Sequence, residues 1–308
     1  MKALISVSDK TGIVDFSRNL LSLGYDIIST GGTGEYLSNN GISVTDVSKI
    51  TNFPEFLDGR VKTLNPIIHG GILAKRENSS HTNQLIEFGI DQIDLVVNNL
   101  YPFQETIKNE NISLEDILEN IDIGGPAMTR AAAKNFSNVL VVVDPEDYQK
   151  IIKAHSNDEI DFKFRKSLAS KAFRHVSFYD TLIADYLSNE KEKSTFFKQK
   201  TNAWELVNIP RYGENPHQSS AVYKLPNEEG GIVNSIKLHG IDMSYLNYFD
   251  ADAAWVSCNI FEENCVSIIK HGNPCGLSIN NNQTEAYLEA LSGDPVSAFG
   301  GIVGFNST

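Results

Sequence analysis

Strand-like and helix-like segments alternate through the first fifty residues, and this alternation restricts the chain to few folds. The apolar run Ala3–Val7 has the composition of a strand that is covered on both faces. Further strands are expected at Tyr25–Ser29 and Ser43–Val47, with a glycine turn and a helix near Thr33–Asn39 between them. The segment Asp9–Leu23 carries apolar residues at helical spacing, namely Ile13, Phe16, Leu20 and Leu23. This order predicts an α/β fold with a doubly wound parallel sheet.

The alternation continues beyond residue 50. Two more buried strands are expected at Ile93–Asn98 and Val139–Val143. Helices are expected near Leu114–Asn120, Gly125–Lys134 and Pro145–Ala154, followed by a long helical stretch over Asp161–Asn189.

A chain of 308 residues is longer than a domain with a single hydrophobic core usually is, so two domains are expected. The charged segment Glu190–Gln199 has the composition of a connection, which predicts domains at residues 1–199 and 200–308. The second domain, from near Trp204, is expected to contain a strand at Ser220–Tyr223, a helix near Asp250–Glu262 and a strand at Cys265–Lys270. Asn273 and Pro274 are expected to force a turn after that last strand.

Composition excludes several classes of function. A formal net charge of −13 disfavours binding to a nucleic-acid backbone, which requires many Lys and Arg. No apolar stretch is long enough to span a bilayer, and the N-terminus does not resemble a signal peptide, so a cytoplasmic protein is expected. The spacing of Cys258, Cys265 and Cys275 predicts reduced thiols and no metal site. Cys258 and Cys265 are expected in the core, and Cys275 is expected to permit a tight turn.

Polar residues follow several predicted strands where the strands end. Ser8, Lys10 and Thr11 follow the first strand, Thr30–Gly34 follows the second, and Asn98–Tyr101 closes a later one. Because ligands collect at the carboxyl ends of parallel strands, these motifs are expected to meet at one edge of the sheet. Gly32 and Thr33 suit a helix N-terminus that binds an anion, and a glycine turn with a Ser/Thr cap explains them equally well.

Other polar residues also allow two interpretations. Arg60, Lys62 and Thr63 form a cluster of two cations and a hydroxyl that indicates an anion site. The alternative is that Lys62 is an ordinary exposed lysine. Asp122 precedes Gly124 and Gly125, which are expected to open a helix. Its carboxylate could act on a substrate, or it could simply stabilise the N-terminus of that helix. A straight helix over Gly125–Lys134 spans roughly 14 Å, so Asp122 and Lys134 share a substrate only if the backbone turns back or a second subunit supplies one of them.

Taken in order, these motifs resemble a known family. Ser6–Gly12, Ser29–Gly34, Gly59–Pro66, Asn98–Phe103 and Asp122–Pro126 are similar to the inosine monophosphate (IMP) cyclohydrolase domain of the bifunctional purine biosynthesis proteins. Arg211–Gln218 and Lys270–Gly276 resemble the formyltransferase domain of the same family. The resemblance implies a methylglyoxal synthase-like first domain and part of a cytidine deaminase-like second domain. The motif Asp294–Gly301 lies well inside the family's formyltransferase domain, so a fragment with incomplete formyl transfer is expected.

The resemblance also implies roles for individual residues. The first domain would close 5-formamidoimidazole-4-carboxamide ribonucleotide to IMP, using the catalytic residues Lys62, Tyr101, Asp122 and Lys134. The backbone near Gly124 and Gly125 would help to polarise the formyl oxygen. Substrate would be held by Ser8, Lys10, Thr11, Gly32, Thr33, Arg60, Thr63 and Asn98. Asn65 stands where the family usually has histidine, which removes any acid–base role from that position.

In the second domain, the implied reaction transfers a formyl group from 10-formyltetrahydrofolate to 5-aminoimidazole-4-carboxamide ribonucleotide. Lys270 and His271 match the family's catalytic pair, and Arg211 and Tyr212 match its nucleotide-binding motif. The family implies a homodimer, purine-pathway nucleotides and a folate cosubstrate as partners, and no metal.

Two other functions fit the same predicted fold. One is a non-catalytic regulatory domain that binds a phosphate ligand, and the other is a methylglyoxal synthase-like lyase. A binding module has no need for Lys62, Tyr101 and Asp122, and the motifs of the second domain disfavour the lyase.

Overall fold

The structure is a computed structural model that describes all residues except 55–56, 102, 109–111, 189–195, 227 and 308. It contains two compact units, Met1–Asn202 and Ala203–Thr308. The charged run Glu190–Lys193, which is expected to connect the domains, lies outside the described residues. The assignment of an activity to each unit stays a prediction.

Five parallel strands form the centre of the first unit, in the order β3-β2-β1-β4-β5. They are β1 Lys2–Val7, β2 Asp26–Ser29, β3 Thr45–Asp46, β4 Leu95–Asn99 and β5 Leu140–Val142. All side chains of β4 and β5 are buried, as expected for strands covered on both faces. The register pairs Ala3 with Leu95, which brings together segments that lie far apart in the sequence. The predicted doubly wound α/β fold is confirmed.

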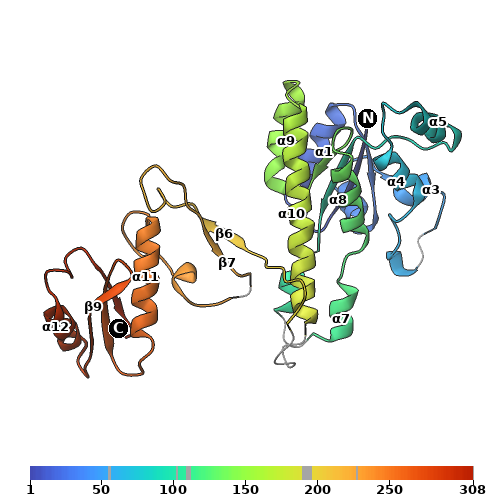
Figure 1. Cartoon of the computed structure of the whole chain (residues 1–308). Helices are drawn as coiled ribbons and strands as arrows, with labels where there is room; N and C mark the ends of the chain where they lie inside the picture. The colour runs from blue at the N-terminus through green and yellow to red at the C-terminus, as the bar shows by residue number, and fades with distance from the viewer. Residues whose placement is uncertain (55–56, 102, 109–111, 189–195, 227, 308) are drawn as a thin grey trace. The chain divides into compact units, whose positions relative to one another are not determined.

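Helices cover the sheet on both sides (Figure 1). They are α1 Ile13–Ser22, α2 Gly31–Asn39, α3 Val47–Thr51, η1 Leu57–Gly59, α4 Pro66–Leu73, α5 Ser79–Glu87, α6 Phe103–Ile107, α7 Leu114–Glu119, α8 Gly124–Lys134, η2 Pro145–Asp147, α9 Tyr148–Ser156 and α10 Phe162–Leu187. Helix α1 packs on α9, where the rings of Phe16 and Tyr148 stack with centroids 4.2 Å apart. Helix α8 packs on α10 and α4.

Local capping explains where the first unit departs from the predicted elements. The third strand is limited to Thr45–Asp46, because Asp46 Oδ1 accepts the N–H of Ser48 at 2.8 Å and starts α3 at Val47. Helix α1 begins only at Ile13, after Gly12 adopts a left-handed conformation with φ 67°. The glycines expected to form a turn before Thr33 instead form the first turn of α2.

The second unit combines two antiparallel sheets with two helices. Its elements are β6 Glu205–Asn208, β7 Val222–Lys224, η3 Ile232–Asn234, α11 Tyr245–Cys258, β8 Cys265–Lys270, β9 Asn273–Ile279, α12 Gln283–Gly293 and β10 Ile302–Phe305. β6 pairs with β7, and β8 lies between β10 and β9. Helix α11 starts earlier than expected because Ser244 and Asn247 form a capping box.

The turn after β8 also differs from its prediction. His271 and Gly272 form it with φ values of 53° and 72°, and Asn273 already pairs with Lys270 as the first residue of β9. Two positive φ values suit the tight hairpins that match strand twist. Cys275 is not in this turn: the register shifts from Pro274 to Gly276, so Cys275 is the extra residue of a β-bulge. Cys258 and Cys265 are fully buried, as predicted.

Candidate active site

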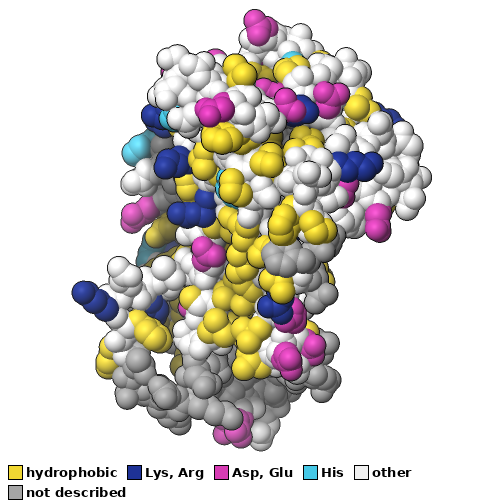
Figure 2. Space-filling view, turned by 90° about the vertical axis from the view of Figure 1, so that its right-hand side faces the viewer, with side chains coloured by type: hydrophobic (Ala, Val, Ile, Leu, Met, Phe, Trp, Pro, Cys, Tyr) yellow, Lys and Arg dark blue, Asp and Glu magenta, His cyan; other side chains and the backbone are white. Residues whose placement is uncertain are grey.

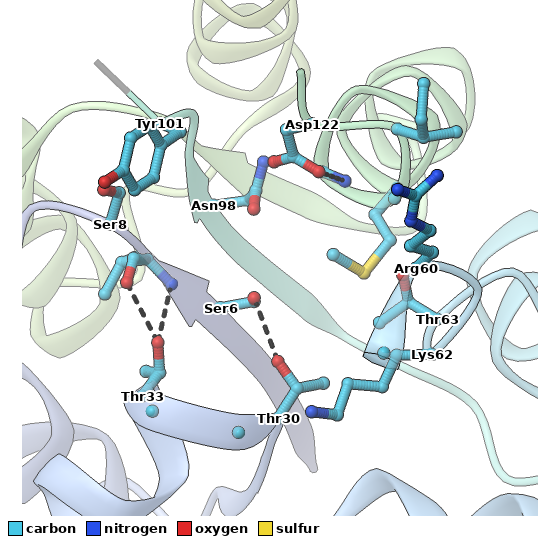
Figure 3. Close-up of a pocket in the computed structure, with 18 of the residues that line it drawn as sticks. Ser6, Ser8, Thr30, Thr33, Arg60, Lys62, Thr63, Asn98, Tyr101 and Asp122 are labelled. Carbon is cyan, nitrogen blue, oxygen red and sulfur yellow. Dashed lines mark hydrogen bonds between the residues drawn. The ribbon is translucent and has the colours of Figure 1, made fainter. Parts of the chain in front are cut away.

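A cavity of about 760 Å³ opens at the carboxyl ends of β1 and β4 (Figure 3). The N-terminal turns of α2 and α8 and the segment after η1 complete its walls. Twelve of the residues predicted from the first half of the chain line it: Ser8, Lys10, Gly32, Thr33, Arg60, Lys62, Thr63, Asn98, Tyr101, Asp122, Gly124 and Gly125. The expected meeting of the motifs at one edge of the sheet is therefore observed.

Thr11 and Lys134 are not among the described residues that line this cavity. Thr11 is exposed, and its backbone N–H donates to Asp9 Oδ1 at 2.8 Å within the loop after β1. Lys134 is exposed at the last residue of α8, whereas Gly124 at the other end of that helix lines the cavity. Ten residues of α8 lie between Asp122 and Lys134, which separates the two side chains as expected for a helix that runs away from the cavity.

The N-terminus of α2 forms one wall of the cavity. Thr30 is its N-cap residue, and the hydroxyl oxygens of Thr30 and Ser6 lie 3.1 Å apart. The first-turn residues Gly31 and Gly32 border the cavity, where the positive end of the helix favours an anion. The Thr33 hydroxyl was expected to meet that anion, but it donates to the carbonyl of Val7 at 2.9 Å and accepts the N–H of Val7 at 3.1 Å. It therefore fastens α2 to β1.

Lys62 points toward Thr30 and the start of α2 (Figure 3). Burial opposes ionisation of the Asp46 carboxyl, but hydrogen bonds donated by Ser48, together with the nearby charges of Lys62 and Lys49, lower its pKa. Arg60 forms an ion pair with Glu119, another residue that lines the cavity. The Arg60 guanidinium is therefore partly neutralised by a protein carboxylate.

Asp122 is the half-buried acid of the site. Burial raises the pKa of its carboxyl above the ordinary value of 3.8, although hydrogen bonds from the N–H groups of Gly125 and Gly124 oppose this shift. The Gly125 N–H donates to Asp122 Oδ1 at 2.9 Å, so the carboxyl also caps α8. This contact differs from the expectation that the Gly125 N–H polarises a substrate oxygen, because the carboxylate already occupies the helix N-terminus.

Two glycines of α8 permit close approach at this point. A Cβ atom on Gly125 would lie 2.1 Å from Asp122 Oδ2, and one on Gly124 would lie 2.6 Å from Thr63 Oγ1. The buried side chain of Asn98 donates to Thr129 Oγ1 at 2.9 Å and lies beside Asp122 (Figure 3). Glycine at both positions is therefore required for Asp122 and Thr63 to reach their places.

The structure adds residues to the site for which the sequence predicts no role. Asn99 Oδ1 accepts the N–H groups of Ser8 at 2.6 Å and Asp9 at 2.9 Å, which fixes the loop after β1. Ser6, Thr30 and Asn120 also line the cavity. The positions of Ser6, Thr30 and Asn99 within the motifs at the strand ends could have indicated that they belong to the site. No sequence motif marks Asn120. Tyr101 is 47% exposed, and its ring borders the cavity beside Ser8 (Figure 3).

In the second unit, the predicted catalytic pair Lys270 and His271 lies at the end of β8, whereas the predicted nucleotide-binding pair Arg211 and Tyr212 lies in the segment between β6 and β7. Lys270 closes β8, and its ammonium donates to the carbonyl of Phe299, while His271 is exposed in the hairpin turn. Asp250 of α11 accepts the N–H of Gly272 at 2.8 Å and so anchors this turn. The guanidinium carbon of Arg211 lies 5.5 Å from the centroid of the Tyr212 ring. A separate cavity is lined by the residues that follow this pair and by one residue of α11, namely Gly213, Glu214, Gln218, Ser219, Ser220 and Tyr245.

The first unit is thus a doubly wound α/β domain with a polar pocket at its strand ends, and comparison with known proteins extends this classification. The model of MGS-like domains matches residues 12–127, and the model of the AICARFT/IMPCHase bienzyme matches residues 132–308, more than half of the chain. The chain therefore belongs to the AICARFT/IMPCHase bienzyme family.

Individual relatives agree with this assignment. The chain is 51% identical to the bifunctional purine biosynthesis protein PurH of Thermoanaerobacter sp. (strain X514) over 100% of its own length and 60% of that protein. It is 48% identical to PurH of Caldicellulosiruptor bescii over 99% of its length, again covering 60% of the relative. The chain thus spans about 60% of the length of these curated relatives.

A solved structure is also similar. The structure described as "Crystal structure of ForH" shares 37% sequence identity and a TM-score of 0.55, covering 61% of this chain and 99% of that chain. In the part of this chain that the structure describes, no helix is long and apolar enough to cross a membrane.

Proposed function

We propose that the first unit closes 5-formamidoimidazole-4-carboxamide ribonucleotide to IMP with loss of water. The observation that carries this proposal is that one cavity combines a half-buried carboxyl, a phenol and an ammonium group with a helix N-terminus. Asp122, Tyr101 and Lys62 supply the three side chains, and α2 supplies the helix. Two family models and relatives named as bifunctional purine biosynthesis proteins support the same reaction.

The proposed chemistry divides between the two sides of the cavity. The carboxamide nitrogen attacks the formyl carbon, a C–N bond forms, and the formyl oxygen gains negative charge. Lys62 and Tyr101 stabilise this oxyanion, and Asp122 accepts the proton that the carboxamide nitrogen loses. The oxygen then leaves as water and the former formamide nitrogen loses its proton, which creates the C=N bond of the new ring. A raised pKa suits Asp122 to this exchange, because it brings the carboxyl nearer to the operating pH.

The phosphate and ribose of the substrate would occupy the side of the cavity near α2. Gly32 and the start of α2 offer backbone N–H groups, and Lys10 and Arg60 offer positive charge. Ser8 would complete the polar lining there, whereas Thr63 and Asn98 lie beside the start of α8 and would contact the ribose or the base. Thr33 would act indirectly, because its hydroxyl bonds the backbone of Val7. Binding a substrate here would place its base end toward Asp122, with the formyl oxygen directed across the cavity toward Lys62 and Tyr101 (Figure 3).

For the whole protein we propose formyl transfer from 10-formyltetrahydrofolate to 5-aminoimidazole-4-carboxamide ribonucleotide. Lys270 and His271 would carry proton transfer, and Arg211 and Tyr212 would bind the nucleotide. The family match over residues 132–308 supports this second activity. We also propose a cytoplasmic location, because purine nucleotides and folates are substrates of the cell interior.

A homodimer is part of the proposal. On the side of the first unit seen in Figure 2, hydrophobic side chains gather in a band that runs down the middle of the face. Large exposed hydrophobic residues of this unit include Leu64, Leu73, Leu118 and Ile123. Contiguous apolar surface of this kind suits an interface with another chain. Light scattering coupled to size-exclusion chromatography should give twice the mass of one chain.

The proposed ring closure is tested with the purified 308-residue chain and synthetic 5-formamidoimidazole-4-carboxamide ribonucleotide. Formation of IMP without folate, followed by chromatography, is the expected result. Tight binding of the nucleotide without turnover would support the regulatory binding module instead. Release of methylglyoxal from dihydroxyacetone phosphate, with no IMP formed from the nucleotide, would support the lyase.

A further inference from the structure

Helix α10 presents three polar side chains at intervals of four residues, and each contacts a different loop at the edge of the sheet that holds the site. Lys171, His175 and Tyr179 lie one helical turn apart, so they share one face of the helix. The Lys171 ammonium bonds Asp144 at 2.5 Å and Asp147 at 2.7 Å, just after β5. His175 Nε2 accepts the N–H of Leu100 at 3.4 Å, directly before Tyr101.

Tyr179 makes the contact closest to the proposed chemistry. Its hydroxyl accepts the backbone N–H of Asp122 at 2.8 Å and donates to the carbonyl of Asn120 at 3.4 Å. Burial raises the pKa of the Tyr179 phenol, so the hydroxyl remains protonated and able to donate. The hydroxyl therefore bridges the two ends of the short segment that carries Asp122 into the cavity.

The ring of Tyr179 reaches the other side of the site. Tyr179 is 5% exposed and packs edge-on against Phe103, with ring centroids 6.1 Å apart. The Phe103 N–H donates to the carbonyl of Tyr101 at 2.7 Å. One side chain thus contacts the segment of Asp122 through its hydroxyl and the segment after Tyr101 through its ring.

We infer that Tyr179 is a positioning residue for ring closure, which holds the Asp122 carboxyl in its reactive place through the backbone of residues 120–122. Tyr179 does not line the cavity, so its effect is transmitted through Asp122. This inference rests on the proposed function. A carboxyl displaced by about 1 Å loses much of its effect on the rate, whereas groups that bind the phosphate are unaffected.

The test compares two hydroxyl deletions on the same helix. Tyr179→Phe removes the bridge to Asp122. The matched control, Thr181→Val, removes a buried hydroxyl that donates only to the carbonyl of Ser177 in α10 itself. We expect Tyr179→Phe to lower kcat for IMP formation about tenfold or more with KM within about twofold of the parent value. We expect Thr181→Val to leave both constants unchanged.

A second measurement does not depend on activity. Hydrogen exchange followed by mass spectrometry should show faster exchange at residues 120–125 in Tyr179→Phe and parent-like exchange there in Thr181→Val. If Tyr179→Phe does not fold, Phe103→Leu takes its place, because it removes the ring on which Tyr179 packs. Its kcat should also fall while KM is kept.

The outcomes separate the two hypotheses. A parent chain without IMP formation refutes the proposed function. An active parent with a Tyr179→Phe variant of parent kcat, or with equal losses in Tyr179→Phe and Thr181→Val, refutes the positioning role of Tyr179.

Discussion

A Cβ atom built on Gly31 would lie 2.9 Å from the ammonium nitrogen of Lys62. Gly31 also has a φ of 40°, which L-residues with side chains rarely adopt. The absence of a side chain at Gly31 therefore creates the space that Lys62 occupies beside the start of α2. An ammonium at the positive end of a helix is electrostatically unfavourable, and an anion bound between them would reverse that effect.

Gly31→Ala should destabilise the first unit and displace Lys62. We expect a loss of about 1 kcal/mol or more in unfolding free energy, because alanine is strained at positive φ. Urea unfolding of the variant measures this loss. Gly32→Ala is the stability control, since nothing lies within 4 Å of its built Cβ and its φ is not in the left-handed region. An unfolding midpoint for Gly31→Ala at or above that of Gly32→Ala would contradict the strain argument.

Lys62→Ala should lower kcat for ring closure by about a hundredfold or more, with a smaller change in KM, if the ammonium stabilises the oxyanion. Steady-state kinetics with the formylated nucleotide measure both constants. Lys49→Ala is the control, because Lys49 is exposed on α3 and lies outside the cavity. A large rise in KM with kcat preserved would instead make Lys62 a phosphate ligand, as its place beside α2 allows.

Asp122→Asn should separate activity from stability. The raised pKa of Asp122 means that the ionised carboxylate destabilises the fold at pH values above its folded pKa. Asparagine keeps an acceptor for the Gly125 N–H and removes this penalty. We therefore expect parent-like or higher unfolding free energy at pH 7, converging with the parent as the pH falls toward 3.8.

The same variant should lose about a hundredfold or more in kcat, because an amide cannot accept the proton. Asp116→Asn, at an exposed position of α7, should keep parent kcat. A variant Asp122→Asn that is less stable than the parent at pH 7 and more stable in acid would show that the sign of the pKa shift is wrong.

Asn65→His should reduce stability. Asn65 is the N-cap of α4: its Oδ1 accepts the N–H of Ile67 at 2.9 Å, and Pro66 takes the first helical position. Histidine caps poorly, so a loss of about 0.5–2 kcal/mol in unfolding free energy is expected. Asn65→Asp should keep the parent value, because aspartate caps as well as asparagine. Equal stability of the histidine and aspartate variants would show that the cap contributes little.

The strand ends of the site were predictable because each motif follows directly from a buried apolar run. Lys10 and Asn98 reach the cavity simply because parallel strands end at one edge. Capping and turn geometry were harder to predict: the Asn273–Pro274 dipeptide suggested a turn, whereas His271 and Gly272 adopt the positive φ values that form it. The contact between Tyr179 and Asp122 could not be predicted, since it joins residues 57 positions apart and depends on how α10 packs.

The pairing of β1 with β4 has a consequence for synthesis of the protein. Ala3 leaves the ribosome long before its partner Leu95. Because a chain grows at roughly 5–20 residues per second, β1 waits several seconds before β4 can pair with its second edge. Such non-local pairing also slows folding, because loop closure precedes the contacts that reward it. A nascent chain that ends before residue 179 would have every cavity-lining side chain and still lack the hydroxyl that bridges Asn120 and Asp122. Catalytic competence should therefore appear late in translation, only after α10 has emerged and docked.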